Sequence, residues 1–208
     1  MDSGATASPA VRIGRGIAPH EREAVSALYV QAFSRKLGAG IPDAAALRAV
    51  VADPLRSGSV LVARDADSRA VLGICGVVLD GRPAVDVTWA GLREHLGIRR
   101  SLRALLLLAP LVRSAPPRVL LLDGLVVDRA VRGRGVGTAL LDAALELARE
   151  QSQDAVRLSV VDTNPLAARL YVRRGFQVVE EGGRGPLAPI VRGIYGFSGY
   201  RVLERSVR

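Results

Sequence analysis

Residues 119–150 read VLLLDGLVVDRAVRGRGVGTALLDAALELARE and contain the pattern that decides the fold. Residues 119–127 are almost all aliphatic, which is typical of a buried strand. A turn with glycines at 133, 135 and 137 and arginines at 132 and 134 follows. Over 138–150 the apolar residues recur at helical spacing, which predicts an amphipathic helix. The stretch is therefore predicted to form a strand, a glycine-rich turn and a helix.

The glycine-rich turn has the features of an anion-binding loop. Glycine has no Cβ, so backbone N–H groups can close around an anion, and the next helix adds its free N–H groups and positive dipole end. A P-loop would need a lysine, and the dinucleotide fingerprint would need glycine at 138, where Thr138 stands. The turn therefore predicts a phosphate or pyrophosphate site of another kind. The alternative is a tight turn with exposed arginines.

Two motifs resemble those of the GNAT superfamily of acyl-CoA-dependent N-acyltransferases. The pattern RxxGxG at 132–137 resembles motif A of that family, and N-x6-Y-x3-GF at 164–176 resembles motif B. The resemblance implies an α/β (α+β) fold with a mixed, mostly antiparallel central sheet. It also implies helices on both faces of the sheet and fourth and fifth strands that splay apart.

Hydrophobic periodicity and breaker residues place the elements around these motifs. We expect strands at 11–17, 59–64, 70–79, 119–127, 156–161, 176–181 and 200–206, and helices at 19–36, 42–51, 89–96, 99–113, 138–150 and 164–174. Residues 182–198 are expected to form a loop. Residues 1–10 are expected to be a flexible N-terminus, and 11–207 a single domain with a helical insertion at about 81–118, between the third and fourth strands.

The insertion carries more leucine than one solvated helix would expose. Leu102, Leu105, Leu106, Leu108, Leu111 and Val112 are therefore expected to pack beside the acceptor site or in a dimer interface. Arginines at 99, 100, 103 and 113 flank these residues, so a helix lying on a membrane surface is the alternative.

The resemblance implies acetyl-CoA as cosubstrate, bound in the V between the splayed strands. Its pantetheine amides would pair with the backbone of Leu125, Val126 and Val127. Its pyrophosphate would rest on the turn and the helix start, at Arg132, Gly133, Arg134, Gly135, Val136, Gly137 and Thr138. Asn164 would contact the cosubstrate, and its alternative role is a plain helix N-cap.

The resemblance also implies direct attack of an amine on the thioester. Tyr171 would donate a proton to the departing thiolate, and its alternative role is packing in the core. Asp123 is the candidate base, and its alternatives are a solvated edge residue or a partner to an arginine. Ser159 stands where the family often has a second carboxylate, so deprotonation through water stays open. Cys75 is expected to be a small core residue.

Composition bears on several other function classes. One cysteine and two distant histidines leave no metal-ligand pattern, so we expect no metal ion. The net charge of +9 invites a nucleic-acid partner, but 28 of the 29 basic residues are arginine and only one Trp, four Tyr and three Phe are present. Aromatic residues for base stacking are therefore few, and we expect no nucleic-acid partner. Without a long apolar segment or a signal peptide, we expect no membrane span and a cytoplasmic location.

These observations predict an acetyl-CoA-dependent N-acetyltransferase that acts on a primary amine. The acceptor is left open between a small molecule and a protein, with an N-terminus or a lysine as the protein site. A homodimer is possible. The alternative from another class is a module that binds acyl-CoA without catalysis and serves regulation.

Overall fold

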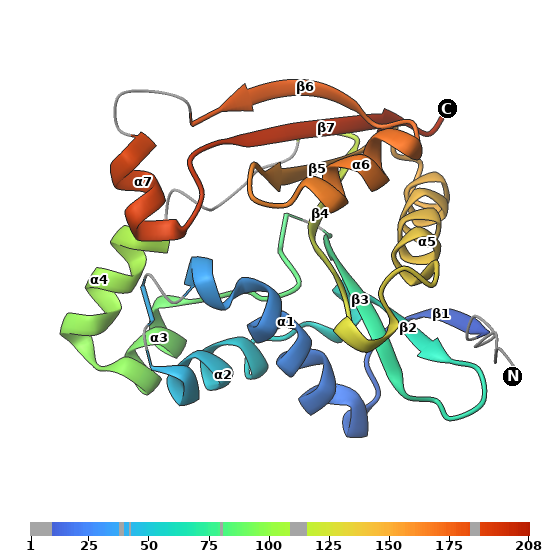
Figure 1. Cartoon of the computed structure of the whole chain (residues 1–208). Helices are drawn as coiled ribbons and strands as arrows, with labels where there is room; N and C mark the ends of the chain where they lie inside the picture. Colours follow the sequence, from blue (N-terminus) through green and yellow to red (C-terminus); the bar gives the residue numbers. More distant parts are fainter. Residues whose placement is uncertain (1–9, 38–39, 42, 80, 109–115, 184–187) are drawn as a thin grey trace, which may run out of the picture.

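A single mixed sheet organises the chain in the computed structural model, which describes residues 10–37, 40–41, 43–79, 81–108, 116–183 and 188–208. The strands of this part are β1 (Val11–Arg15), β2 (Val60–Asp65), β3 (Val71–Val78), β4 (Val119–Val127), β5 (Ala155–Val161), β6 (Gln177–Gly182) and β7 (Tyr200–Ser206). They lie in the order β1-β2-β3-β4-β5-β7-β6 (Figure 1). Every neighbouring pair is antiparallel except β4 and β5. The predicted mixed, mostly antiparallel sheet is confirmed.

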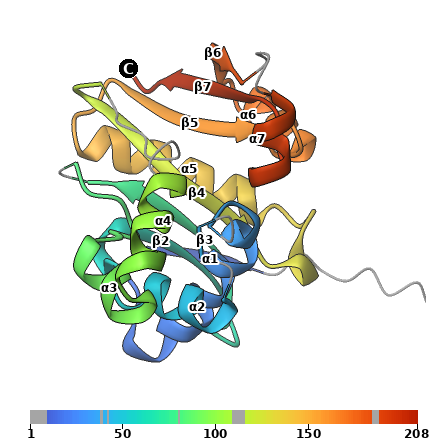
Figure 2. The same ribbon diagram turned by 90° about the vertical axis from the view of Figure 1, so that its left-hand side faces the viewer.

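Helices cover both faces of the sheet, as predicted (Figure 2). One layer consists of α1 (Arg22–Leu37), α2 (Ala44–Ala52), α3 (Trp89–Leu96) and α4 (Ile98–Leu108), and the other of α5 (Val136–Glu150) and α6 (Pro165–Arg173). Successive residues of a strand face opposite sides of the sheet, so each face has its own hydrophobic core. In β2, Val60 and Val62 pack with the first helix layer, whereas Leu61 and Ala63 pack with α5.

A further helix, α7 (Ala188–Tyr195), connects β6 to β7. The prediction of a loop over 182–198 is therefore wrong for this stretch. Eight residues that include Pro189 and Gly193 give too short a periodic pattern to identify from the sequence. Tyr195 Oη donates to the carbonyl of Leu107 at 2.7 Å, which joins α7 to the end of α4.

The insertion forms the predicted helices, α3 and α4, but Leu102, Leu105 and Leu106 are exposed within the single chain. Their packing in a dimer interface stays a prediction. Small residues face the core, since Ser101 and Ala104 are fully buried. Leu102 and Leu106 are 58% and 76% exposed, and Leu105 is also exposed. The segment is therefore helical as expected, but the face that carries Ser101 and Ala104 is turned toward the core, and the face that carries Leu102 and Leu106 is turned outward. Residues 109–113 of the predicted helix lie outside the described residues, as do 1–9 of the predicted flexible terminus.

A partly buried ion pair fixes the start of α1 against the sheet. Arg64 of β2 binds Glu21 through Nε–Oε1 (2.6 Å) and Nη2–Oε2 (2.7 Å). Glu21 Oε2 also accepts from the N–H of Ala18 at 2.8 Å. The hydrogen bonds from Arg64, and then the one from Ala18, lower the pKa of Glu21 to about 2 against the opposing effect of burial. This contact sets the position from which α1 crosses β3 and β4.

No helix among the described residues has the length and apolar character needed to cross a membrane. The same residues contain no group of three or more His, Cys, Asp or Glu side chains suited to hold a metal ion.

Candidate active site

The sheet opens between β4 and β5. The parallel pairing covers Val119–Ala155, Leu120–Val156 and Leu121–Arg157, and then ends. Beyond this point β4 stays paired with β3 as far as Val127, and β5 stays paired with β7 as far as Val161. Residues 122–127 of β4 therefore have no strand partner on the β5 side, and the predicted splay of the fourth and fifth strands is confirmed (Figure 1).

Asp123 is the extra residue of a β-bulge at the apex of this opening. Val77 pairs with Leu122 and Gly76 pairs with Gly124, so Asp123 has no opposite residue in β3. A bulge interrupts the alternation of side chains along a strand and redirects the residue it contains. Leu122 and Leu125 consequently pack with the same core cluster, although regular alternation would put them on opposite faces. Asp123 is exposed, two residues beyond the last β4–β5 pair.

The backbone of β4 beyond the bulge faces the opening at alternate residues. The N–H of Asp128 donates to the carbonyl of Leu72 at 2.9 Å, so the backbone groups of residue 128 face β3. Because hydrogen-bonded and non-hydrogen-bonded pairs alternate, the register directs those of Val126 to β3 as well. The N–H and C=O groups of Leu125 and Val127 then point into the opening. The Val126 side chain is buried on the α1 side.

The glycine-rich turn lies at the open end of β4. Arg132 Nε donates to the carbonyl of Val127 at 3.1 Å, which fastens the turn to the strand. Gly133 and Gly135 have φ angles of +79° and +84°, a region that side chains disfavour, and a Cβ at either position would meet no atom within 4 Å. Open space therefore lies above both glycines. Arg134 is exposed beside them.

The start of α5 continues this cradle. Gly135 is the N-cap and offers no side-chain cap, whereas Asp43, Thr88 and Asn164 cap α2, α3 and α6 with side-chain oxygens. The first-turn N–H groups, at Val136, Gly137 and Thr138, precede the first intrahelical bond, from Ala139 N–H to Gly135. The Val136 side chain is buried, so only its backbone can contact a ligand, and Thr138 is half-buried.

Gly137 allows the helix start to lie close to β4 and α6. A Cβ at this position would lie 3.4 Å from Leu170, 3.5 Å from Val127 and 3.7 Å from Leu125. The turn, the open edge of β4 and helix α6 therefore meet at one place. The structure thus brings the motif A residues together with Leu125 and Val127 of the strand, whereas the backbone of Val126, also selected from the sequence, faces β3.

Asn164 is the N-cap of α6, which is the alternative role expected for it from the sequence. Its Oδ1 accepts from the N–H of Ala167 at 3.3 Å. Asp162 performs a different task, because its carboxylate accepts from the N–H groups of Ser198 and Gly199, the latter at 2.9 Å. Asp162 thereby ties the end of β5 to the segment before β7.

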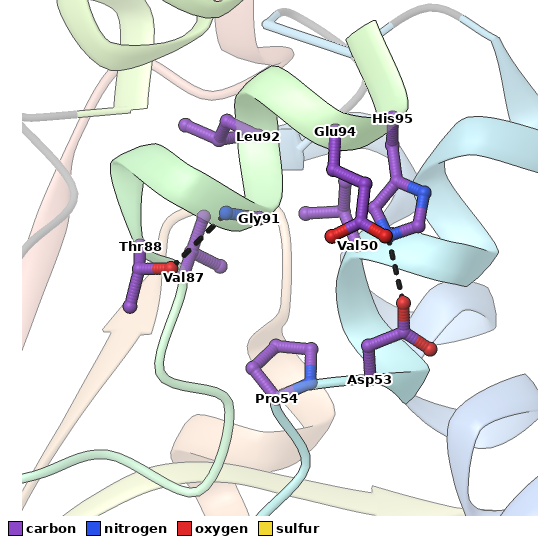
Figure 3. Close-up of a pocket in the computed structure, with 9 residues that line it drawn as sticks. All are labelled: Val50, Asp53, Pro54, Val87, Thr88, Gly91, Leu92, Glu94 and His95. Carbon is purple, nitrogen blue, oxygen red and sulfur yellow. Dashed lines mark hydrogen bonds and ion pairs between the residues drawn. The ribbon is translucent and has the colours of Figure 1, made fainter.

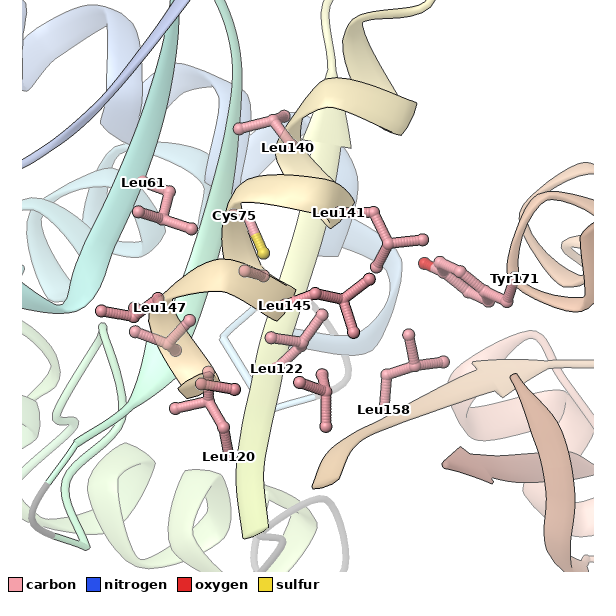
Figure 4. Packing of buried hydrophobic residues seen from close by; sticks show 14 of the residues in the cluster. Leu61, Cys75, Leu120, Leu122, Leu140, Leu141, Leu145, Leu147, Leu158 and Tyr171 are labelled. Carbon is pink, nitrogen blue, oxygen red and sulfur yellow. The ribbon is translucent and has the colours of Figure 1, made fainter. Parts of the chain in front are cut away.

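Tyr171 lies in the core between α6 and α5. It is 6% exposed, its ring centroid is 6.1 Å from that of Phe176, and in Figure 4 its hydroxyl points toward Leu141. Burial, and then the neighbouring Cys75, raise the pKa of the Tyr171 phenol. The phenol is therefore protonated at neutral pH and is a donor. Core packing and the donor role are compatible in this position.

Cys75 is fully buried beneath α5 (Figure 4). Burial, and then the charge of Asp123, raise the pKa of its thiol to about 12. The thiol is thus protonated at neutral pH, and a covalent route through Cys75 is disfavoured. The prediction that Cys75 is a small core residue is confirmed.

Tyr29 of α1 also reaches this region and was not selected from the sequence. It is 3% exposed, and a Cβ on Gly76 would lie 2.1 Å from its hydroxyl oxygen. Gly76 is the pairing partner of Gly124, the residue after Asp123. The glycine in β3 was the available signal, but nothing local in the sequence connects it to a tyrosine 47 positions earlier.

Comparison with known proteins agrees with this geometry. The family profile described as Acetyltransferase (GNAT) family matches residues 57–176, more than half of the chain. The chain belongs to the GNAT acetyltransferase family. It is thus an acyltransferase, and enzymes of this family generally use acetyl-CoA. A search of curated proteins gives no significant match.

Solved structures share the GNAT acetyltransferase fold over nearly the whole chain. A GCN5-related N-acetyltransferase from Kribbella flavida is 22% identical, with a TM-score of 0.59, and the match covers 95% of this chain and 98% of that one. A putative arylalkylamine N-acetyltransferase 7 from the mosquito Aedes aegypti is 17% identical, with a TM-score of 0.61 and coverages of 95% and 88%. Ard1 from Thermoplasma volcanium is 22% identical, with a TM-score of 0.54 and coverages of 96% and 99%.

One cavity of this acetyltransferase lies outside the opening. It has a volume of about 260 Å³ between the end of α2 and α3 (Figure 3). His95 Nε2 lies 2.7 Å from Asp53 Oδ2 at its edge, and this contact joins the insertion to α2. None of its lining residues comes from β4, β5 or the glycine-rich turn.

Proposed function

We propose that this protein transfers an acetyl group from acetyl-CoA to a primary amine by direct attack. The observation that carries the proposal is the continuity of the site. The opened edge of β4 begins at the bulged Asp123, presents Leu125 and Val127, and ends at the glycine-rich turn. A thioester held along this edge would have a carboxylate at one end and an anion cradle at the other.

The residues present fit acetyl-CoA. The V-facing backbone groups of Leu125 and Val127 suit the amides of a pantetheine arm, in the manner of an added strand. The open space over Gly133 and Gly135 and the uncapped start of α5 suit a pyrophosphate. Arg132 and Arg134 add positive charge, and Asn164 would contact the cosubstrate while capping α6. The bound thioester supplies an activated acetyl group.

Two side chains would manage the protons of the reaction. Asp123 takes a proton from the acceptor amine, directly or through a water molecule, because a protonated amine is not a nucleophile. Tyr171 gives a proton to the sulfur atom that leaves, and its raised pKa keeps the phenol protonated until that moment. The high pKa of the Cys75 thiol supports direct attack over a covalent acyl-enzyme.

A panel of amines tests this function. The purified protein is incubated with acetyl-CoA and with small primary amines, peptides with free N-termini, or lysine peptides, and the released thiol is measured. Turnover that depends on one amine class identifies the acceptor. Saturable acetyl-CoA binding without thiol release from any amine would refute catalysis and favour a regulatory module.

A further inference from the structure

Helix α4 turns a row of apolar side chains outward. Ile98, Leu102 and Leu106 recur at every fourth residue, and their exposed fractions are 60%, 58% and 76%. Residues four apart are neighbours on one helix face, so the three side chains form a continuous row. Leu105 lies beside this row and is also exposed. The outer face of α4 therefore presents an apolar surface that the chain itself does not cover.

Arginines run alongside this apolar row. Arg99 and Arg103 are four residues apart on α4, Arg100 lies between them in sequence, and all three are exposed. Within the part of the chain that the structure describes, their side chains take part in no ion pair or hydrogen bond. The sequence of α4 contains no Asp or Glu, and the whole chain has a net charge of +9. The outer face of α4 thus combines apolar side chains with uncompensated positive charge.

Helix α7 lies on the same side of the molecule. Tyr195 near its end donates to the carbonyl of Leu107 of α4 at 2.7 Å, and both helices lie on the side away from α5 (Figures 1 and 2). Ile190 and Ile194, four residues apart on α7, are also exposed. Arg192 of α7 is exposed, and α7 likewise contains no Asp or Glu. Two neighbouring helices from distant parts of the chain therefore share this composition.

We propose that the outer face of α4, with α7 beside it, docks the protein on an anionic lipid bilayer. A helix that lies in a bilayer interface buries its apolar row at the boundary of headgroups and acyl chains. Arginines beside that row extend toward the headgroups, where the planar guanidinium matches a phosphate. The α4 face supplies both groups in adjacent rows. No residue of this face belongs to the β4–β5 opening, so the docking is independent of acetyl transfer.

Charge favours a bilayer over a second copy of this chain. A two-fold interface centred on the α4 face would place its arginines against the same arginines of the second copy. Neither α4 nor α7 has an acidic residue to offset this repulsion. An acidic protein would neutralise the arginines, but apolar side chains that protrude this far suit a phase that they can penetrate. The homodimer and the acidic protein are therefore the alternatives that an experiment has to separate.

Co-sedimentation of the full chain with lipid vesicles tests the docking. The vesicles contain phosphatidylcholine alone, or phosphatidylcholine and phosphatidylglycerol in equal amounts. Binding to the anionic vesicles should be at least about tenfold stronger at low salt, and it should weaken as salt is added. The double variant Leu102→Gln with Leu106→Gln should weaken this binding about tenfold or more, because two side chains of the apolar row are lost.

Charge variants separate the α4 face from a general attraction of a basic protein. The double variant Arg99→Gln with Arg103→Gln should weaken binding to the anionic vesicles about tenfold or more at low salt. The matched control is Arg12→Gln with Arg173→Gln, which removes the same charge from exposed positions on β1 and α6. The control should weaken binding less than about threefold, because those arginines lie away from the proposed contact.

A fluorescent label reports the contact at a single position. Cys75, the one cysteine of the chain, is buried, so an environment-sensitive fluorophore on Leu106→Cys reads that position alone. Its emission should shift to the blue on anionic vesicles as the label enters the bilayer interface. The same label on Val179→Cys, an exposed position of β6, should show no such shift.

Four results would overturn the docking. Absence of binding to anionic vesicles, or an equal loss in the two arginine double variants, would remove the role of α4. Equal emission shifts of the two labels would do the same. A dimer in sedimentation velocity that becomes monomeric in Leu102→Gln with Leu106→Gln would assign the face to a second copy. Binding of poly-glutamate without binding of vesicles would assign it to an acidic protein.

Discussion

Substitution of Gly135 by aspartate tests the pyrophosphate cradle. Acetyl-CoA at 100 times its Kd should stabilise the folded protein by about 2.7 kcal/mol. For a chain of 208 residues each kcal/mol raises Tm by about 2–4 °C, so the expected shift is about 5–10 °C. The assay is thermal unfolding with and without acetyl-CoA.

In Gly135→Asp the carboxylate would lie in the space that the pyrophosphate is proposed to occupy. Two unit charges about 5 Å apart at an effective dielectric constant of about 20 repel by about 3 kcal/mol. This weakens binding about 100-fold or more, and at the same acetyl-CoA concentration the shift should fall to about 1 °C.

The matched control is Gly135→Asn, which has the same shape without the charge. Gly135 has a φ of +84° and open space around a Cβ, so both variants should lose about 1 kcal/mol of stability from the backbone alone. The asparagine variant should keep most of the ligand-induced shift. A full shift in Gly135→Asp would refute the cradle, and equal loss in both variants would refute the electrostatic reasoning.

The remaining predictions concern the proton transfers, the ion pair at α1 and the insertion. Tyr171→Phe should keep acetyl-CoA affinity and lower kcat about 100-fold, and unchanged kcat with chemistry rate-limiting would rule out the donor role. Asp123→Asn should lose activity mainly at low pH, where the amine is protonated, and a pH profile like that of the unaltered enzyme would make Asp123 structural. The lowered pKa of Glu21 contributes stability above about pH 4.5 that is lost as the pH falls toward about 2. Glu21→Gln should therefore cost about 3 kcal/mol at pH 7 by urea unfolding, and the difference should disappear in acid. Leu106→Gln should change stability by less than about 0.5 kcal/mol, whereas Ala104→Gln should cost about 1–3 kcal/mol, and the reverse order would contradict the outward face of α4.

Much of the fold could be predicted because its signals are local. The strand, glycine turn and helix over 119–150 each have a distinct periodicity, and the order of the elements around them followed from similar patterns. The cap at Asn164 is also local, because an asparagine before a proline and an apolar run defines a helix start within a few residues. The candidate site residues 125, 127 and 132–138 lie on this one continuous unit, so sequence patterns could place them together.

The sequence by itself thus determined the strand–turn–helix unit, the family motifs and the helical character of the insertion. Tertiary structure alone decided three things: the bulge at Asp123, the inward face of α4, and the approach of Tyr29 to the opening. A bulge exists only relative to the register of β3, where Gly76 and Val77 pair around the extra residue. The buried face of a helix depends on the shape it meets, and α4 buries Ala104 against its neighbours while Leu102 and Leu106 stay exposed. Tyr29 reaches Gly76 because α1 crosses the sheet, a contact between distant parts of the chain that no local periodicity encodes.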